Sequence, residues 1–432
     1  MGRHHKAAGP DMPEWGSTQW RPFTARATGR EYREPFTPVQ WALSLFLLLA
    51  GIATAVGVVA LWPSDAPANV APEFATTSPL PQAQVDGVVA VRDEGSCQSP
   101  SVGRVFDTSP VAPLAVGESC GRAIVDITSG PNAGKRTLLL VGNHPGDPQL
   151  EEGQKVRLSE QQTADGQVGY AFTDYSRAPS MWFWAALTAL AIIVVGAWRG
   201  ARSLIGLAIT LGAVAVFLLP ALLRGGDPLL LAVVCGSSVL FLVLFLVHGF
   251  SWKTSAALAG TLISMGSAAL LAKYAIASTH IRGLGNEDNL LIQLYLPDVT
   301  VTGLMLCGFI IGALGVLNDV TIAQASTVNE LAEIEPEANP WRLFKGAMTV
   351  GRDHIASMVY TLVLSYTGAA LPLLLLVSVA DRPMGQVLTS DVMATEFLRS
   401  AIGALALALA VPITTLIASF VVVGRRRLAE VT

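Results

Sequence analysis

Charged residues are scarce in this 432-residue chain, where Asp, Glu, Lys and Arg together make up only 14% of the sequence. Soluble domains usually carry about 25% charged residues, so this scarcity argues against a soluble globular protein. The net charge is −4, and the only basic run is Arg425, Arg426 and Arg427, so nothing in the charge pattern indicates a nucleic-acid partner. Hydrophobic residues make up 52% of the chain, and we expect a lipid bilayer to surround most of it.

Residues that hold metals or carry catalysis are also few, with four cysteines and six histidines. His354 and His248 each lack a second His or Cys at ligand spacing, so we expect no metal site. No H-E-x-x-H, G-x-S-x-G or paired-carboxylate pattern is present, so we expect neither an enzyme nor a cofactor. The stretch GPNAGKRT at 130–137 is one residue shorter than a phosphate-binding loop and has Arg136 where that loop needs a hydroxyl. We predict a hairpin turn there instead.

Long apolar runs set the organisation of the chain. Residues 1–40 are polar and lack periodicity, which predicts a flexible tail, and the charge-free run at 41–62 has the length of a membrane span. We interpret this run as an uncleaved signal anchor, because it is too long for an ordinary signal peptide. Further spans are expected at 181–198, 202–223, 227–248, 252–279, 299–318, 355–380 and 398–423. The sequence therefore predicts a polytopic α-helical membrane protein with about eight transmembrane helices, seven of them in a membrane domain at 181–424.

The distribution of basic residues predicts the orientation, because Lys and Arg in short loops resist translocation. With a cytoplasmic N-terminus, the inside loops hold Arg199, Arg202, Lys253, Arg342, Lys345, Arg352 and the terminal arginine triplet. The outside loops hold only Arg224, Arg282, Arg382 and Arg399, each with acidic residues nearby. We therefore expect a bacterial cytoplasmic membrane protein with both termini inside, a basic cytoplasmic end at 425–432, and residues 63–180 outside.

The segment at 63–180 has the pattern of a small β-rich domain. Short runs rich in β-formers alternate with turn residues, at 85–91, 121–127, 136–141, 155–158 and 168–172. Such a pattern suggests a small barrel, for which the OB type is one candidate. This domain either binds a ligand or serves only as a lid or docking module.

Cys97 and Cys120 are the only cysteines of this external region, and an oxidising compartment favours a disulfide between them. The bond would contribute about 3 kcal/mol by restricting the unfolded chain. Cys235 and Cys307 lie in apolar spans, where we expect them to act as small packing residues.

A polar stripe follows the apolar half of the segment IGALGVLNDVTIAQASTVNEL at 311–331. At 100° per residue, one sector of about 120° holds Asn318, Asp319, Ser326, Asn329 and Glu330. Gly312 and Gly315 share this sector, and Gly308 and Gly312 form a G-x-x-x-G spacing that allows close helix packing. Three interpretations stay open: the stripe lines an ion or solute path, the helix simply emerges into water after residue 318, or Asp319 pairs with a base such as Arg352.

Two later spans contain proline. Pro372 and Pro412 each remove a helical hydrogen bond, freeing the carbonyls of Gly368 and Ala408, so we predict helix breaks at both. Hydroxyl residues cluster around these positions, namely Ser365, Tyr366, Thr367, Thr414 and Thr415. Interrupted helices in pairs are typical of transporter binding sites, although proline in a membrane helix is often only a kink. Between the stripe and these breaks, Arg352, Asp353 and His354 are expected at the cytoplasmic surface.

Three segments together resemble the signature regions of the YibE/F family of bacterial integral membrane proteins. They are IGALGVLNDVTIAQASTVNEL, VGRDHIASMVYTLVLSYTGAALPLLLL and TEFLRSAIGALALALAVPITTLIA, and the resemblance includes the layout of an anchor, a β-rich domain and a helical domain. It spans most of 80–424, and the region of Cys97 and Cys120 looks like a local addition. The matching positions are Gly312, Gly315, Asp319, Glu330, 351–353, Tyr366, Gly368, Pro372, Arg399, Gly403 and Pro412. The resemblance implies a permease-like protein whose family has no established substrate.

The leading hypothesis is a permease-like transporter of an unknown solute. Its predicted path is lined by Asn318, Asp319, Ser326, Glu330, Tyr366, Thr367 and Thr414. The alternative is a non-transporting envelope protein, in which the external domain binds a protein partner and the helices only anchor it. Association of identical chains into a homo-oligomer is a further expectation.

Overall fold

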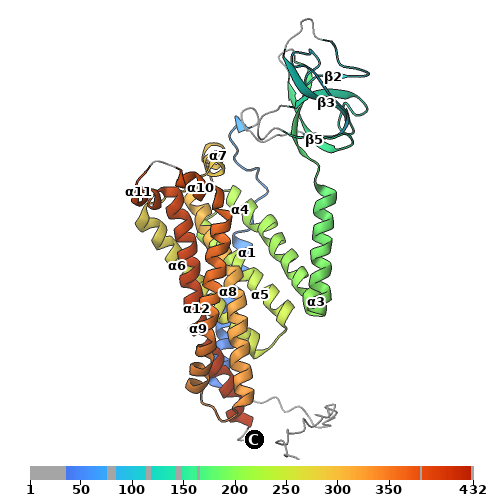
Figure 1. The fold of residues 1–432 in the computed structure, drawn as a ribbon. Coiled ribbons are helices and arrows are strands. Elements are labelled where there is room, and N and C mark those ends of the chain that lie inside the picture. Colours follow the sequence, from blue (N-terminus) through green and yellow to red (C-terminus); the bar gives the residue numbers. More distant parts are fainter. Residues whose placement is uncertain are drawn as a thin grey trace, which may run out of the picture.

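The structure, a computed structural model, describes residues 36–74, 84–112, 118–141, 148–162, 166–379 and 382–429. Most of the tail predicted at 1–40 lies outside this part of the chain. The described residues form a helical bundle and one antiparallel sheet (Figure 1). The helices are α1 Pro38–Ala60, α3 Ala178–Ala213, η1 Val214–Leu218, α4 Leu219–Leu223, α5 Pro228–His248, α6 Trp252–Thr279, α7 Glu287–Tyr295, α8 Val301–Ile334, α9 Pro340–Ala369, α10 Leu371–Ser378, α11 Met384–Leu388 and α12 Asp391–Ala429.

Several of these helices are long and apolar enough to cross a membrane. Within the described residues six helical segments meet this condition, and a seventh is added if α9 and α10, bent by 66° at Ala370, form one broken span. The expected spans at 181–198 and 202–223 fall together in the single stretch Ala178–Leu223. Within it, Ala197 has non-helical angles (φ 47°, ψ −134°), and in Figure 1 the chain turns back sharply at the foot of α3.

Contacts between distant segments define two ends of the bundle. At one end, called the terminal end, Leu43 near the start of α1 packs with Ala259 of α6 and Val421 of α12. At the other, called the sheet end, the Arg224 guanidinium donates to the Ala66 carbonyl (2.9 Å), just beyond α1. The Arg282 amide likewise donates to Asp391, at the start of α12 (2.8 Å). The start of α1 and the far part of α12 therefore lie at the same end, opposite the sheet (Figure 1).

The described residues of the segment at 63–180 form six strands. They are β1 Gln84–Ser96, β2 Val105–Phe106, β3 Ser119–Ile127, β4 Arg136–Val141, β5 Lys155–Gln162 and β6 Val168–Tyr175, in the order β2-β4-β3-β1-β5-β6. Each of the five runs expected from the sequence is a strand, and the two-residue β2 is additional. Val89, Val125, Leu158 and Tyr170 belong to its buried core. The OB type of this domain stays a prediction.

Two local predictions about this domain are confirmed. A disulfide joins Cys97 to Cys120, whose Cα atoms are 5.2 Å apart beside the last pairs of β1 with β3. The stretch at 130–137 is a hairpin turn between β3 and β4, closed by the Gly134 amide on the Ile127 carbonyl (2.8 Å). Gly134 has a φ of +88°, which favours glycine and suits a tight turn rather than a phosphate loop.

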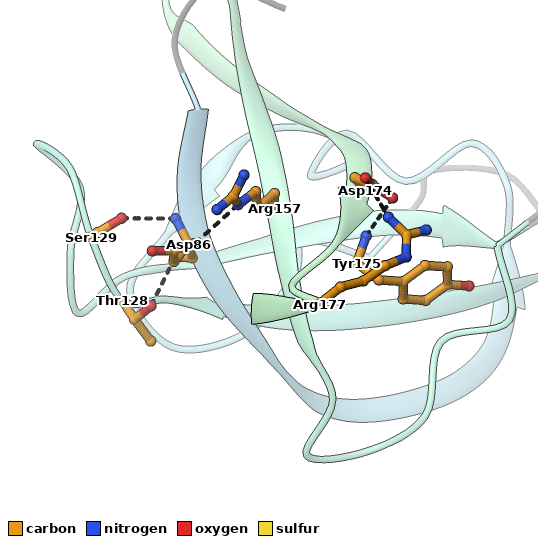
Figure 2. A network of polar contacts seen from close by, with 7 residues as sticks. All are labelled: Asp86, Thr128, Ser129, Arg157, Asp174, Tyr175 and Arg177. Carbon is orange, nitrogen blue, oxygen red and sulfur yellow. Dashed lines mark hydrogen bonds and ion pairs between the residues drawn. The ribbon is translucent and has the colours of Figure 1, made fainter. Parts of the chain in front are cut away.

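The exit from the sheet into α3 is held by a small polar network (Figure 2). Arg177 donates to one carboxylate oxygen of Asp174 (2.6 Å), and the Tyr175 amide donates to the other (2.8 Å). The hydrogen bond from Arg177, followed by that from the Tyr175 amide, lowers the pKa of Asp174 below its ordinary value. A second group in the same view centres on Asp86, which contacts Arg157, Thr128 and Ser129.

Candidate functional site

Asp319 lies about halfway between the two ends of the bundle, as helix register shows. Trp252, whose ring meets Phe36 just before α1, marks the terminal end. Thr261, nine residues along α6 and so about 14 Å further, meets Thr321 of α8 hydroxyl to hydroxyl (2.6 Å). Asp319 precedes Thr321 by two residues in α8, which runs toward the terminal end. Asp319 is therefore about 3 Å further from that end, about 17 Å from the level of Trp252.

Measured from the sheet end, Asp319 is again about halfway along the bundle. The Cys307 thiol contacts the carbonyl of Pro228, the first residue of α5, at 3.0 Å. Asp319 follows Cys307 by twelve residues in α8, or about 18 Å. The expected span at 299–318 therefore covers only about half of α8. The helix runs on to Ile334, and beyond residue 318 it stays packed in the bundle, where Thr321 and Gln324 contact polar groups of other helices.

Those partners come from α6 and α12. Thr321 meets Thr261, and the Thr415 hydroxyl of α12 lies within hydrogen-bond distance of both the side-chain oxygen of Gln324 (3.0 Å) and the Val411 carbonyl (2.6 Å). All four side chains are buried. Gln324 also lies against Gly351 of α9, where an added Cβ would come within 2.8 Å of its amide nitrogen. These contacts tie α8 to three neighbours at mid-bundle, and of the residues that make them only Thr415 belongs to the hydroxyl cluster expected from the sequence.

A cleft of about 400 Å³ opens between α8 and α9 beside Asp319, and we call it the acidic cleft. It is lined by Gly312, Gly315, Val316, Asp319, Ser357, Met358, Thr361, Leu362, Ser365 and Tyr366. Nothing lies within 4 Å of the position that a Cβ on Gly315 would occupy, so the missing side chain leaves the α8 wall open. Asp319 is exposed to this space, and no ion pair joins it to Arg352 within the described part of the chain.

The hydroxyls of the acidic cleft follow one row of α9. Thr361 donates to the backbone carbonyl of Ser357 (3.2 Å), and Ser365 donates to that of Thr361 (2.7 Å). Because each proton is used inside the helix, these hydroxyl oxygens offer lone pairs to the cleft. Ser357 and Thr361 were not among the expected site residues, although their spacing of four with Ser365 is visible in the sequence.

A second cleft, of about 830 Å³, lies on the other side of Tyr366, and we call it the outer cleft. Its lining includes Thr279, Tyr366, Thr367, Thr389, Glu396 and Ser400. Tyr366 lines both clefts, and its hydroxyl lies 2.8 Å from the position of a Cβ on Gly312. The Arg399 guanidinium lies 5.9 Å from its ring centre and bonds Glu396 (2.9 Å).

The other expected path residues are dispersed. Asn318 is half-buried with its side-chain oxygen unpartnered, Ser326 is half-buried, and Glu330 is exposed about 17 Å further along α8. Thr414 is fully buried, and its hydroxyl is 2.0 Å from the position that a Cβ on Gly260 of α6 would occupy. None of these four residues lines the acidic or the outer cleft.

The two predicted helix breaks differ. Pro372 is in the first turn of α10, next to the 66° bend, so a break is present there. The break expected at Pro412 is wrong, because α12 continues through it as one helix. A single proline removes one donor, and the neighbouring hydrogen bonds hold the helix together.

His354 was expected at the surface but is half-buried, with Nδ1 shielded from solvent and without a partner among the described residues. It lies one turn beyond Gly351, which contacts Gln324, and so close to mid-bundle. The part of the chain that the structure describes contains no group of three His, Cys, Asp or Glu side chains that could hold a metal ion.

Comparisons with known proteins address the helical part of the chain. The model of the YibE/F-like protein family matches residues 184–424, so the match leaves out the β domain that the sequence resemblance included. No curated protein and no solved structure matches the chain. The matched region holds α5 to α11, nearly all of α3, and α12 as far as residue 424, with both clefts, and it is more than half of the chain. The chain therefore belongs to the YibE/F-like protein family.

Proposed function

We propose that this membrane protein is a permease-like transporter whose solute passes through the acidic cleft beside Asp319. The observation that carries the proposal is the position of Asp319, exposed in a cleft halfway along the bundle. A hydrocarbon layer is about 30 Å thick, so a residue about 17 Å from either end lies near its centre. A carboxylate at that depth is costly, and such residues usually face a solute or ion pathway.

The proposed membrane topology has eight crossings with both termini in the cytoplasm. Gly206 of α3 lies against Val243 near the end of α5, whereas Phe217 of η1 meets Trp62 at the sheet end. After Ala197 the chain therefore runs from the terminal end to the sheet end. The stretch from Ala178 to Ala197 runs in the opposite direction and supplies a separate crossing. Eight crossings return α12 to the side where α1 begins, which agrees with the excess of basic residues there.

The direct test is complementation in a strain that lacks the protein, grown on a panel of toxic and nutrient solutes. Asp319→Asn keeps the size of the side chain and removes its charge, so we expect loss of the transport phenotype at unchanged abundance. Glu330→Gln is the matched control, because Glu330 is exposed and lines neither cleft. Lowered abundance of Asp319→Asn would mean that the charge is structural, and equal phenotypes of the two variants would contradict the path.

A second candidate function is a non-transporting envelope protein whose external domain binds a partner. It is favoured by the β domain, which stands beyond the bundle and lies outside the family match (Figure 1). Deletion of residues 67–178 separates the two proposals. Partner binding would be lost on this deletion and would survive Asp319→Asn, whereas transport depends on Asp319.

A further inference from the structure

The charged side chains that line the two clefts are acidic in both. Among the described residues, Asp319 is the only charged side chain that lines the acidic cleft, and Glu396 is the only one that lines the outer cleft. No described Lys, Arg or His lines either space. Glu396 is neutralised by Arg399, whereas no ion pair joins Asp319 to any described residue, so the uncompensated negative charge belongs to the acidic cleft.

Neutral groups of the acidic cleft add to this negative potential. Thr361 and Ser365 use their protons on helix carbonyls and present lone pairs. The outer cleft repeats the pattern, because Thr279 donates to the Ala275 carbonyl (2.6 Å) and Thr389 to that of Gly385 (2.8 Å). Both linings thus offer hydrogen-bond acceptors to whatever enters.

The nearest other charges on α9 do not reverse this balance. Arg352 and Asp353 precede Ser357, the first α9 residue of the lining, by five and four residues; they are exposed, carry opposite signs and are not part of the lining. His354 is adjacent to them, and it does not line the cleft. Arg399, whose guanidinium lies 5.9 Å from the centre of the Tyr366 ring, is bonded to Glu396.

We propose that the acidic cleft binds a monovalent cation of the ammonium type, and that Tyr366 separates this site from the outer cleft. The inference rests on the proposed function. A carboxylate with hydroxyl acceptors fits N–H donors carrying a positive charge, since charge-assisted hydrogen bonds are the strong ones. A cleft of about 400 Å³ is of the size that small-molecule sites have. Tyr366 is placed as the partition because it is the one residue that the two linings share.

Charge selectivity can be measured without knowing the solute, by the reaction of a cleft cysteine with two probes of opposite charge. The protein carries Ser357→Cys, or Thr361→Cys as a second position, with Cys235→Ala and Cys307→Ala and the external disulfide intact. Sealed vesicles receive the cationic trimethylammonioethyl or the anionic sulfonatoethyl methanethiosulfonate, and each rate is divided by that for free cysteine in solution. Gln386→Cys, on the exposed side of α11, reports that the reagents reach the protein.

We expect the normalised rate of the cationic probe to exceed that of the anionic probe by about tenfold or more. Asp319→Asn should bring the ratio of these two rates close to one. We expect Tyr366→Ala to accelerate modification from the sheet side, and Tyr366→Phe, which keeps the ring, to leave it slow. Equal normalised rates for the two probes would overturn the cation site and leave the path standing. No reaction of either cleft cysteine from either face, with Gln386→Cys reactive, would overturn the path itself.

Discussion

The hydroxyl of Tyr366 on α9 lies 2.8 Å from the point where a Cβ on Gly312 of α8 would be, so the phenol tip occupies the space that this glycine leaves. The contact closes the acidic cleft on the side of the outer cleft. It joins the polar stripe of α8 to the region of the α9–α10 bend, two features that the sequence shows separately.

Gly312→Ala is predicted to displace the Tyr366 hydroxyl and to reduce transport. The added methyl group would meet the hydroxyl at 2.8 Å, whereas the next ring atom, Cζ, is 4.0 Å away, an ordinary contact. Adding Tyr366→Phe removes the clashing oxygen and should restore much of the transport, measured by complementation. A double variant no better than Gly312→Ala alone would contradict this role of the contact.

Two further glycines of the membrane domain should respond to alanine in opposite ways. At Gly260 an added Cβ would lie 2.0 Å from the Thr414 hydroxyl and 3.0 Å from its backbone Cα, so α6 and α12 would have to separate. We expect Gly260→Ala to lower the midpoint of thermal unfolding in detergent by several degrees. Gly315→Ala meets nothing within 4 Å and should leave that midpoint unchanged or raise it. Equal effects at the two sites would argue against the packing of α6 on α12 described above.

The Gln324–Thr415 pair should stabilise the contact of α8 with α12. Thr415→Val leaves the buried side-chain oxygen of Gln324 without this donor, which typically costs about 1–3 kcal/mol. Gln324→Leu combined with Thr415→Val removes both polar groups, so it should cost less than the sum of the single changes. A strictly additive double-mutant cycle, measured by denaturation, would show that the two side chains do not interact.

Removal of the disulfide is predicted to weaken the β domain and to leave the bundle intact. The bond closes a loop of 23 residues, for which the chain-entropy model gives about 3 kcal/mol. Cys97→Ser with Cys120→Ser should therefore make the 84–175 region more sensitive to protease, and labelling at Gln386→Cys should not change. Unaltered proteolysis would show that the sheet is stable without the bond.

The sequence was sufficient for the features that depend on local pattern. Hydropathy identified the apolar helices, turn residues identified the hairpin at 130–137, and compartment chemistry identified the pairing of Cys97 with Cys120. The sequence was less informative about α8, where buried polar residues have partners on other helices. The expected span stops at residue 318, where polar residues begin to crowd the sequence, whereas Thr321 and Gln324 beyond it are buried against α6 and α12.

A usable signal was present beyond that boundary. The buried positions continue with a spacing of three or four residues through Leu317, Val320, Gln324, Val328 and Ala332, as expected of a helix that stays packed. Pro412 shows the opposite error, since a residue that can break a helix was predicted to do so. The residues on both sides of Pro412 are helical, and the proline alone does not show whether the helix continues through it.

Cysteine accessibility along α8, in sealed vesicles and without Cys235 and Cys307, tests the central claim most directly. A water-filled acidic cleft predicts that cysteines at Gly312, Gly315 and Asp319 react with a membrane-impermeant reagent, whereas those at Leu317 and Val320, which face the buried core, do not. Reaction confined to positions beyond Glu330, with residues 312–320 all protected, would mean that no path reaches Asp319 and would contradict the transporter proposal.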